Sequence, residues 1–467
     1  MTQSLRFFYC LKEIFYKRMN KPKLAVGYEC TPIGDGEQIF GEPRDVLDAT
    51  RHYERFEHDF DLQEELGIGE LRYPAGWDKI LISPYRYDFD RVAPIMESMR
   101  RRGFVPTIDL CHHKAPKKIK DGFANPEFPE YLLDFALEFQ KAFPWVERYT
   151  IINEPAVTAL FHSDGLWANQ KWSDVFLNMA CAISVTSRAL KERNPRIKFF
   201  QPEPIDHDAF REDADAELVA HVKFLRDYGR FGMDNLLGGK IDESHAFFER
   251  LVARGADPRR VLWFQKNPSE PYQKDLDFYA HCFKTWFRDS QGRMTHKANP
   301  NPPSLASVIA DYRAQMPEMK MGIGETNVRG PVRDRITFFK WVLEQCVQAG
   351  ISRVSWWGLT DADMWGDGNL TRWWRTGNPD PVGIYNLTNH PVKGRLWNRE
   401  ANEFSEVLKA YAHGQLSIQD IPAYQFSGEL KNVLNGYTGH HTKHWQRQNH
   451  NKVKQKSYEI LPVLEAV

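Results

Sequence analysis

Short apolar runs rich in β-branched and aromatic residues alternate along most of the chain with longer amphipathic stretches. The short runs are typical of strands buried on both faces, and the longer stretches carry apolar residues at helical spacing. Strands that alternate with helices indicate βα units around a parallel sheet. Eight runs are predicted as strands: 23–30, 68–74, 104–112, 146–155, 197–204, 276–282, 320–326 and 351–360.

Amphipathic helices are predicted between most of these strands, and several of them end at glycine or before proline, as helix C-termini often do. The predicted helices are 46–66, 89–103, 131–143, 175–193, 305–316 and 336–350. The spacing is regular except between residues 204 and 276, where we expect additional loops or helices. The pattern predicts an α/β protein, a single (β/α)₈ TIM barrel with elaborated loops, which suits a chain of 467 residues.

Both ends of the chain depart from this pattern. We expect residues 1–22 to be an N-terminal extension, 23–430 the catalytic barrel and 431–467 a polar, histidine-rich tail. Lys12 and Glu13 interrupt the apolar start before the hydrophobic region of a signal peptide forms. No run reaches the roughly 18 uncharged apolar residues that a membrane helix needs. We therefore expect a soluble protein without a membrane partner.

Charge and cysteine content narrow the class of protein further. The 62 basic and 62 acidic residues cancel at neutral pH, which argues against a nucleic-acid partner. The cysteines lie far apart and form no CxxC pair, so reduced, buried thiols in a cytoplasmic protein fit better than a disulfide framework. The six are Cys10, Cys30, Cys111, Cys181, Cys282 and Cys346.

Polar side chains gather at the C-terminal ends of the predicted strands. They are Glu29, Arg72, His112, Asn153, Glu154, Glu203, Tyr279, Glu325 and Trp357. In a (β/α)₈ barrel these ends surround one cavity, and the catalytic groups of the fold lie there. A purely structural role, in which polar residues only mark the end of a strand, would explain such residues at one or two strands. It does not easily explain them at the ends of all eight.

Glu154 and Glu325 form the best candidate pair among these residues. Glu154 lies in the segment IINEP, where Asn153 precedes it and Pro155 fixes the chain as it leaves the sheet. Glu325 ends the apolar run MGIGET, although a loop or helix-capping glutamate is the alternative. Retaining glycosidases use one carboxyl group to protonate the leaving oxygen and a second, about 5 Å away, to attack the anomeric carbon. Repulsion between two close carboxylates keeps one protonated, and we assign the raised pKa to Glu154.

The motifs, in this order over about residues 23–390, resemble glycoside hydrolase family 1, the (β/α)₈ family of β-glucosidases and β-galactosidases. In that family the fourth strand ends in Asn-Glu-Pro, and its glutamate is the acid/base. The resemblance therefore implies that Glu154 is the acid/base. The family's nucleophile is a glutamate at the end of the seventh strand, which implies this role for Glu325. The implied activity is hydrolysis of β-glycosides through a covalent glycosyl-enzyme, with no cofactor and no metal.

Other positions follow from the same resemblance. His112 in IDLCHHKAP is similar to the histidine that hydrogen-bonds the sugar, and the register favours it over His113. Asn153 is expected to contact the substrate as well. Arg72 in ELRYP resembles the arginine beneath the nucleophile that keeps it ionised, and Tyr279 in LDFYAHC resembles the tyrosine that hydrogen-bonds the nucleophile.

The eighth predicted strand supplies two tryptophans. SWWGLTDADMW resembles the family's Trp-Ser-Leu-Leu-Asp-Asn-x-Glu-Trp segment, which implies that Trp357 lies under the sugar ring as a stacking platform. Aromatic faces suit the C–H surface of a sugar, but a core tryptophan is the alternative. Trp365 aligns with the last tryptophan of the segment and is expected to bind substrate.

Two departures from the family pattern bear on the substrate. Where the first strand of the family delivers a glutamine, this chain offers Glu29 or a displaced Gln38. Met364 stands where the family has a glutamate that binds the distal hydroxyls, so we expect the glycone not to be plain glucose. Arg372 and Arg375 nearby are candidates for an anionic group on the substrate, or for ion pairs in a surface loop.

Two other functions remain open on the sequence. A transglycosidase has the same machinery and passes the glycosyl group to an acceptor other than water. A carbohydrate-binding barrel without catalysis is the alternative from another class. A metal-dependent enzyme is disfavoured, because the spacing of His112, His113 and His281 does not require a metal site.

Overall fold

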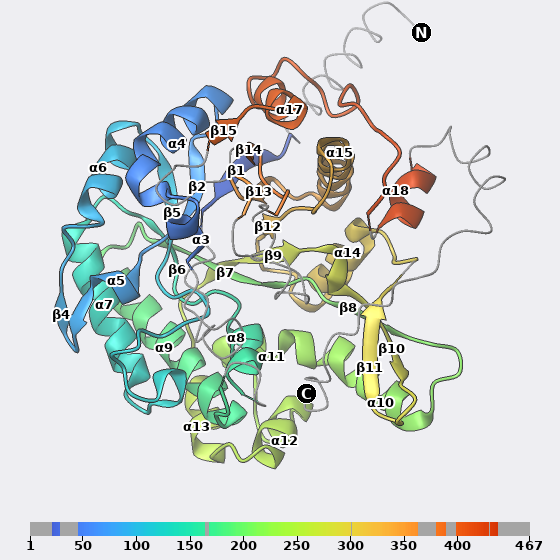
Figure 1. The fold of residues 1–467 in the computed structure, drawn as a ribbon. Coiled ribbons are helices and arrows are strands. Elements are labelled where there is room, and N and C mark those ends of the chain that lie inside the picture. The colour runs from blue at the N-terminus through green and yellow to red at the C-terminus, as the bar shows by residue number, and fades with distance from the viewer. Residues whose placement is uncertain are drawn as a thin grey trace, which may run out of the picture.

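The computed structural model describes residues 21–28, 45–163, 168–299, 301–362, 380–388, 398–428 and 430–437. Eight parallel strands close into a barrel in the order β1-β13-β12-β9-β7-β6-β5-β2 (Figure 1). The strands are β1 Lys23–Gly27, β2 Glu70–Pro74, β5 Val105–Asp109, β6 Arg148–Thr150, β7 Lys198–Pro204, β9 Tyr272–Phe278, β12 Met321–Thr326 and β13 Arg353–Trp357. Each predicted strand overlaps one of these, so the predicted TIM barrel is confirmed.

Helices surround the barrel (Figure 1). The long ones are α4 His52–Leu66, α6 Ala93–Arg101, α7 Phe128–Ala142, α9 Trp172–Arg193, α14 Leu305–Gln315 and α15 Val332–Ala349. The helix predicted over 46–66 is divided into α3 Val46–Ala49 and α4, because Arg51 between them has a left-handed backbone with φ 60°. Gly350 ends α15 with φ 65°, a conformation that glycine adopts without strain. No helix within the described ranges is long and apolar enough to cross a membrane.

The long excursion between β7 and β9 contains helices, as predicted, and also a strand. The helices are α10 Ala216–Asp227, α11 Gly232–Leu237, α12 Ala246–Ala253 and α13 Pro258–Leu262. The strand, β8 His207–Phe210, joins β10 Phe283–Arg288 and β11 Met294–Ala298 in a second sheet of order β11-β10-β8. The sequence pattern did not predict this small sheet beside the barrel (Figure 1).

Shorter elements complete the described structure. Leu434, at the start of the predicted C-terminal tail, is buried in the main core within the last helix. The shorter elements are α5 Trp77–Ile80, β3 Leu81–Ser83, β4 Arg86–Tyr87, η1 Gly122–Ala124, α8 Pro155–His162, η2 Gly229–Phe231, η3 Trp263–Gln265, η4 Ala280–Cys282, β14 Asn386–Thr388, β15 Asn398–Glu400, α17 Glu403–Ala412 and α18 Lys431–Tyr437.

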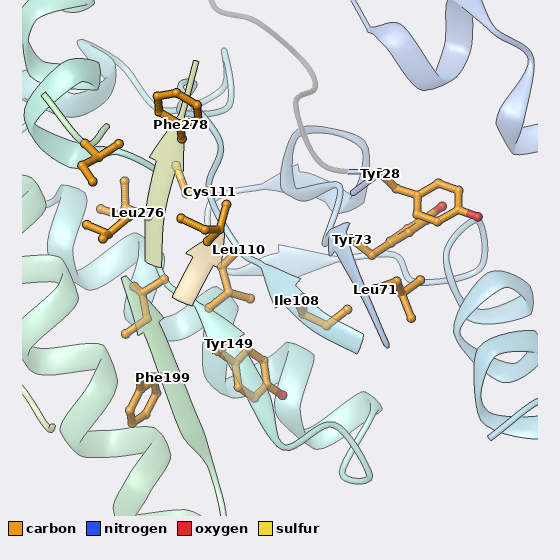
Figure 2. Close-up of a cluster of buried hydrophobic side chains, with 14 of the residues drawn as sticks. Tyr28, Leu71, Tyr73, Ile108, Leu110, Cys111, Tyr149, Phe199, Leu276 and Phe278 are labelled. Carbon is orange, nitrogen blue, oxygen red and sulfur yellow. The ribbon is translucent and has the colours of Figure 1, made fainter. Parts of the chain in front are cut away.

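The main apolar core lies between the barrel and the helices. Figure 2 shows Leu71 and Tyr73 of β2 and Leu276 and Phe278 of β9 among its members. Phe278 stacks on Phe338 of α15, with ring centroids 5.9 Å apart. Successive side chains of a strand point to opposite faces, so the residues between these apolar ones face the inside of the barrel.

The inside of the barrel is charged. Arg353 NH1 lies 3.0 Å from Asp275 Oδ2, and its Nε lies 3.3 Å from Glu70 Oε2. Arg148 pairs with the same Glu70 at 2.9 Å. These charged, inward-facing residues explain why the predicted bounds of the strand 276–282 were wrong. The strand begins at Tyr272, and its inward-facing polar residues hid its first half from a search for apolar runs.

The described cysteines are free thiols. Cys111, Cys282 and Cys346 are buried, and Cys181 is partly buried. Burial raises the pKa of each of them, so the four remain protonated at neutral pH.

Candidate active site

Glu325 lies at the end of β12, in which all six residues are buried. Arg72 NH1 donates to its Oε2 at 3.2 Å, and the Tyr279 hydroxyl donates to its Oε1. A cationic donor and a hydroxyl donor both stabilise the ionised form of a carboxyl group. The arrangement therefore holds Glu325 as a carboxylate in a fixed orientation.

Arg72 connects Glu325 to the neighbouring strands. Its NH2 donates to Asp109 Oδ2 at 2.8 Å and to Asn153 Oδ1. The guanidinium is buried, with 1% of the Arg72 surface exposed. Burial raises the pKa of Asp109 to about 7 even though Arg72 opposes the shift. One buried cation on β2 thus orients groups from β5, β12 and the segment after β6.

Glu154 directly precedes α8, whose first residue is Pro155. Proline suits this position because the first N–H groups of a helix have no partner within the helix. Glu154 itself has φ 40°, a left-handed conformation that costs a residue with a side chain on the order of 1–3 kcal/mol. Burial, followed by the negative charge of Glu325, raises the pKa of Glu154 well above its usual range. This environment favours a protonated Glu154.

His112 and His113 lie on either side of the Asn153 amide. Asn153 Oδ1 accepts from Arg72, so its Nδ2 donates, at 3.3 Å, to Nε2 of both histidines. His112 therefore carries its proton on Nδ1, which lies 2.9 Å from Asp109 Oδ2. Burial lowers the pKa of each histidine, so both rings are neutral.

His113 contacts the candidate acid/base. Its Nδ1 lies 2.7 Å from the Thr158 hydroxyl, which donates in turn to Asn153 O. Nδ1 therefore holds the proton, and the lone pair of Nε2 lies 3.5 Å from Glu154 Oε2. An ionised carboxylate this close to an Nε2 atom that carries a lone pair and no proton is repelled, which again favours a protonated Glu154.

Glu203, at the C-terminal end of β7, adds a further buried carboxyl group. Its Oε1 accepts from the Ala156 N–H at 2.7 Å. Burial raises the pKa of Glu203 to about 8, against the attraction of Lys274. The sequence analysis placed Glu203 at a strand end without giving it a role.

Trp357 is the last residue of β13 and is buried. It packs with Val46, Ala362 and Val382, and its carbonyl accepts from Asn327 Nδ2 at 2.7 Å. Its predicted role as a sugar platform stays a prediction. Other predicted positions lie outside the described residues: Glu29, Gln38, Met364, Trp365, Arg372 and Arg375.

Six predicted residues therefore lie in one hydrogen-bonded or electrostatically coupled group: Arg72, His112, Asn153, Glu154, Tyr279 and Glu325. The sequence analysis missed the roles of Asp109, His113 and Asp277. Asp277 lies on β9, and the alternation of polar and apolar residues in YQKDLDF was the signal that predicts its inward orientation. Within the described part of the chain, no group of three or more metal-binding side chains occurs.

No family model matches the chain. A β-glucosidase A from Thermotoga maritima is 26% identical over 305 aligned positions, covering 60% of this chain and 62% of that protein. A β-glucosidase A from Acetivibrio thermocellus is 24% identical over 242 positions, covering 45% of this chain and 52% of that protein. The alignments thus span little more than half the length of these curated relatives.

The structural likeness extends further along the chain. A family 1 β-glucosidase from Thermotoga maritima superposes with a TM-score of 0.65 at 14% sequence identity, covering 85% of this chain and 97% of that one. The same enzyme in complex with deoxynojirimycin gives a TM-score of 0.66, again at 14% identity. The chain therefore resembles the family 1 β-glucosidases and shares their (β/α)₈ fold.

Proposed function

We propose that this protein is a retaining β-glycosidase, with Glu325 as the nucleophile and Glu154 as the acid/base. The observation that carries the proposal is the contrast between two carboxyl groups at the end of one barrel. Glu325 receives hydrogen bonds from Arg72 and Tyr279, whereas burial and neighbouring negative charges favour a proton on Glu154. A retaining glycosidase needs this pair of opposite protonation states.

The first step forms a bond between Glu325 and the sugar. A carboxylate oxygen of Glu325 attacks the anomeric carbon, the bond from that carbon to the leaving oxygen breaks, and the proton of Glu154 moves to the leaving oxygen. In the second step the Glu154 carboxylate takes a proton from water. The water oxygen bonds to the anomeric carbon, Glu325 leaves, and both carboxyl groups return to their starting states.

The resemblance to proteins named β-glucosidase supports a β-linked carbohydrate as the substrate class. Arg72 supports the proposed chemistry because its positive charge stabilises the ionised carboxylate of Glu325, the form that attacks the sugar. Asn153 directly precedes Glu154 and is hydrogen-bonded to His112 and to Arg72, which contacts Glu325. We propose His112 and Asn153 as substrate contacts, together with Trp357, Trp365 and Glu29.

Trapping of the covalent intermediate tests this function. The protein is incubated with a panel of 2-deoxy-2-fluoro-β-glycosyl fluorides, and the intact mass and peptide map are measured. We expect one adduct, on Glu325, and none in Glu325→Gln. An adduct on another residue overturns the assignment of the nucleophile, and no adduct with any sugar favours a carbohydrate-binding barrel.

Kinetics of Glu154→Gln test the second role. Aryl glycosides with a good leaving group need little acid help, so the first step should persist while the second becomes slow. The loss of rate at high pH should disappear in this variant, because the group that must be protonated is gone. A variant that keeps this loss of rate assigns the acid/base elsewhere. Product analysis with added sugars separates hydrolysis from transglycosylation.

A further inference from the structure

A third carboxyl group, that of Asp277, interacts electrostatically with both proposed catalytic glutamates and has no role in the two-step reaction. In the backbone register of the sheet, Asp277 of β9 lies beside Glu325 of β12 on one side and beside Pro204 of β7 on the other. It is completely buried. No N–H or O–H group among the described residues donates to either of its carboxyl oxygens.

The space for this side chain is provided by a glycine on the neighbouring strand. A Cβ atom at Gly324 would lie 2.6 Å from Asp277 Oδ1 and 2.6 Å from Asp275 Cβ. Atoms of a folded protein do not approach so closely, so no larger residue fits at Gly324 while Asp277 keeps its position. The orientation of Asp277 into the barrel is therefore built into the two strands.

The surroundings of Asp277 are negative. The carboxylates of Glu325 and Asp275 act on it electrostatically, and Arg72 is the cation that opposes them. The guanidinium of Arg72 donates hydrogen bonds to Glu325, Asp109 and Asn153. A completely buried carboxylate that receives no hydrogen bond is strongly disfavoured, and such a group takes up a proton instead.

The contact between Asp277 and Glu154 indicates which group accepts a hydrogen bond from the protonated Asp277. The side chain of Asp277 lies within hydrogen-bonding reach of Glu154 and lowers the pKa of that carboxyl group. Two ionised carboxylates offer only acceptors, so this bond exists only when one of them is protonated. Glu154 Oε2 also lies 3.5 Å from Nε2 of His113, which carries no proton and therefore cannot donate a hydrogen bond to Glu154.

We propose that Asp277 holds a proton over the working pH range and donates it in a hydrogen bond to Glu154, as a positioning residue for the acid/base. This inference rests on the proposed function for its meaning, although the proton on Asp277 is a property of the folded chain. Asp277 keeps its proton through both steps. It donates to Glu154 when Glu154 is an acid and also when it is a carboxylate.

The hydrogen bond has a consequence for the acid/base cycle. Burial and the negative charge of Glu325 raise the pKa of Glu154, whereas the bond from Asp277 stabilises the ionised form and lowers it. Glu154 must lose its proton in the first step and regain one in the second, which is fastest when its pKa lies near the working pH. Asp277 thus counteracts a pKa that would otherwise hold the proton too tightly.

Two variants of Asp277 test the inference through the high-pH limb of kcat/KM, where Glu154 loses its proton. Asp277→Asn keeps a neutral donor, and the limb should stay within about 0.3 pH unit of wild type. Asp277→Leu has a similar size and no donor, and the limb should move upward by about one pH unit, a tenfold change in proton affinity. An ionised Asp277 predicts the opposite sign, because removing a negative charge moves the limb downward in both variants. A downward shift in Asp277→Asn, or an unchanged limb in Asp277→Leu, overturns the proposal.

Infrared spectroscopy supplies a readout without catalysis. Protein labelled with ¹³C at the aspartate carboxyls should show a protonated-carboxyl band that is absent from Asp277→Asn and persists above pH 8. The proton of Asp109, whose pKa is about 7, is largely lost there. If the Asp277 variants do not fold, Glu154→Gln identifies the same band by shifting it, because the acceptor changes from carboxyl to amide.

The absence of any such band overturns the inference. If the band is present but no β-glycoside is cleaved and no glycosyl adduct forms, the proposed function fails while the protonation of Asp277 stands. If glycosides are cleaved and the band is absent, the proposed function stands and the protonation of Asp277 fails. The two failures are therefore distinguishable.

Discussion

The guanidinium of Arg72 holds Oε2 of Glu325 at 3.2 Å although 253 positions separate the two residues in the sequence. The same guanidinium reaches Asp109 and Asn153. Glu325 lies near the end of β12 and Arg72 lies in the middle of β2, so closure of the barrel brings them together. The ionised state of the proposed nucleophile is thus set by the topology of the sheet.

Replacing Arg72 with Met should lower both activity and stability. The change leaves Glu325 and Asp109 buried without their cation, which typically costs about 3–5 kcal/mol. We expect kcat/KM to fall at least about a hundredfold, because Glu325 then favours its protonated form. Urea unfolding and steady-state kinetics measure the two effects. The matched control is Arg101→Met, whose exposed ion pair with Glu57 should contribute only about 0–1 kcal/mol. Equal effects of the two variants would contradict a special role for Arg72.

Replacing Tyr279 with Phe removes only the hydroxyl that donates to Glu325 Oε1. A hydrogen bond to a charged group is worth about 1.5–3 kcal/mol, so kcat/KM should fall roughly 10- to 100-fold. Tyr131→Phe is the control, since its hydroxyl bonds the exposed Glu127 at 2.9 Å and lies in another part of the fold. A loss of activity in both variants would indicate a general effect of removing a tyrosine hydroxyl.

The sequence predicted the barrel and the two proposed catalytic glutamates for the same reason. Apolar runs such as MGIGET stop at a polar residue, and the barrel brings the ends of these runs together. Glu154, Arg72 and Tyr279 were also found from motifs that are local in the chain. Local patterns of this kind survive in a single sequence.

Contacts between distant strands could not be predicted in this way. Asp275 and Asp277 lie in a strand whose inward face is polar, so the search for apolar runs began that strand too late. Their positions depend on Gly324 in another strand, and no pattern within either segment indicates this. The break at Arg51 in the predicted helix 46–66 was missed because arginine is not a residue type that favours the left-handed backbone conformation found there.

Replacing Gly324 with Ala should destabilise the protein and lower its activity together. The added methyl group would lie 2.6 Å from Asp275 Cβ, and overpacking of a buried site costs about 1–3 kcal/mol. We also expect lower kcat/KM, because the same methyl group displaces Asp277 from Glu154. Gly69→Ala is the control, since a Cβ there meets no atom within 4 Å. Its urea midpoint should stay near that of wild type. If Gly324→Ala kept the urea midpoint and the kcat/KM of wild type, β9 and β12 would be able to move apart around the added methyl group at no cost in free energy.

Glu203 should make the stability of the folded chain depend on pH. Its pKa is raised to about 8 by burial, from an ordinary value near 4.5. Between these values the folded chain keeps a proton that the unfolded chain has released, so the free energy of unfolding falls as the pH rises. A shift of this size corresponds to roughly 2–4 kcal/mol lost between pH 5 and pH 8.

Glu203→Gln should remove this part of the pH dependence. The amide keeps an oxygen that accepts the Ala156 N–H, but it has no proton to release. Urea unfolding of both proteins at pH 5, 6, 7 and 8 measures the difference, and we expect the variant to gain stability relative to wild type as the pH rises. The control is Glu97→Gln, whose side chain is 56% exposed and should leave the wild-type slope in place. If wild type and Glu203→Gln lose stability in parallel, Glu203 is ionised in the folded chain at neutral pH.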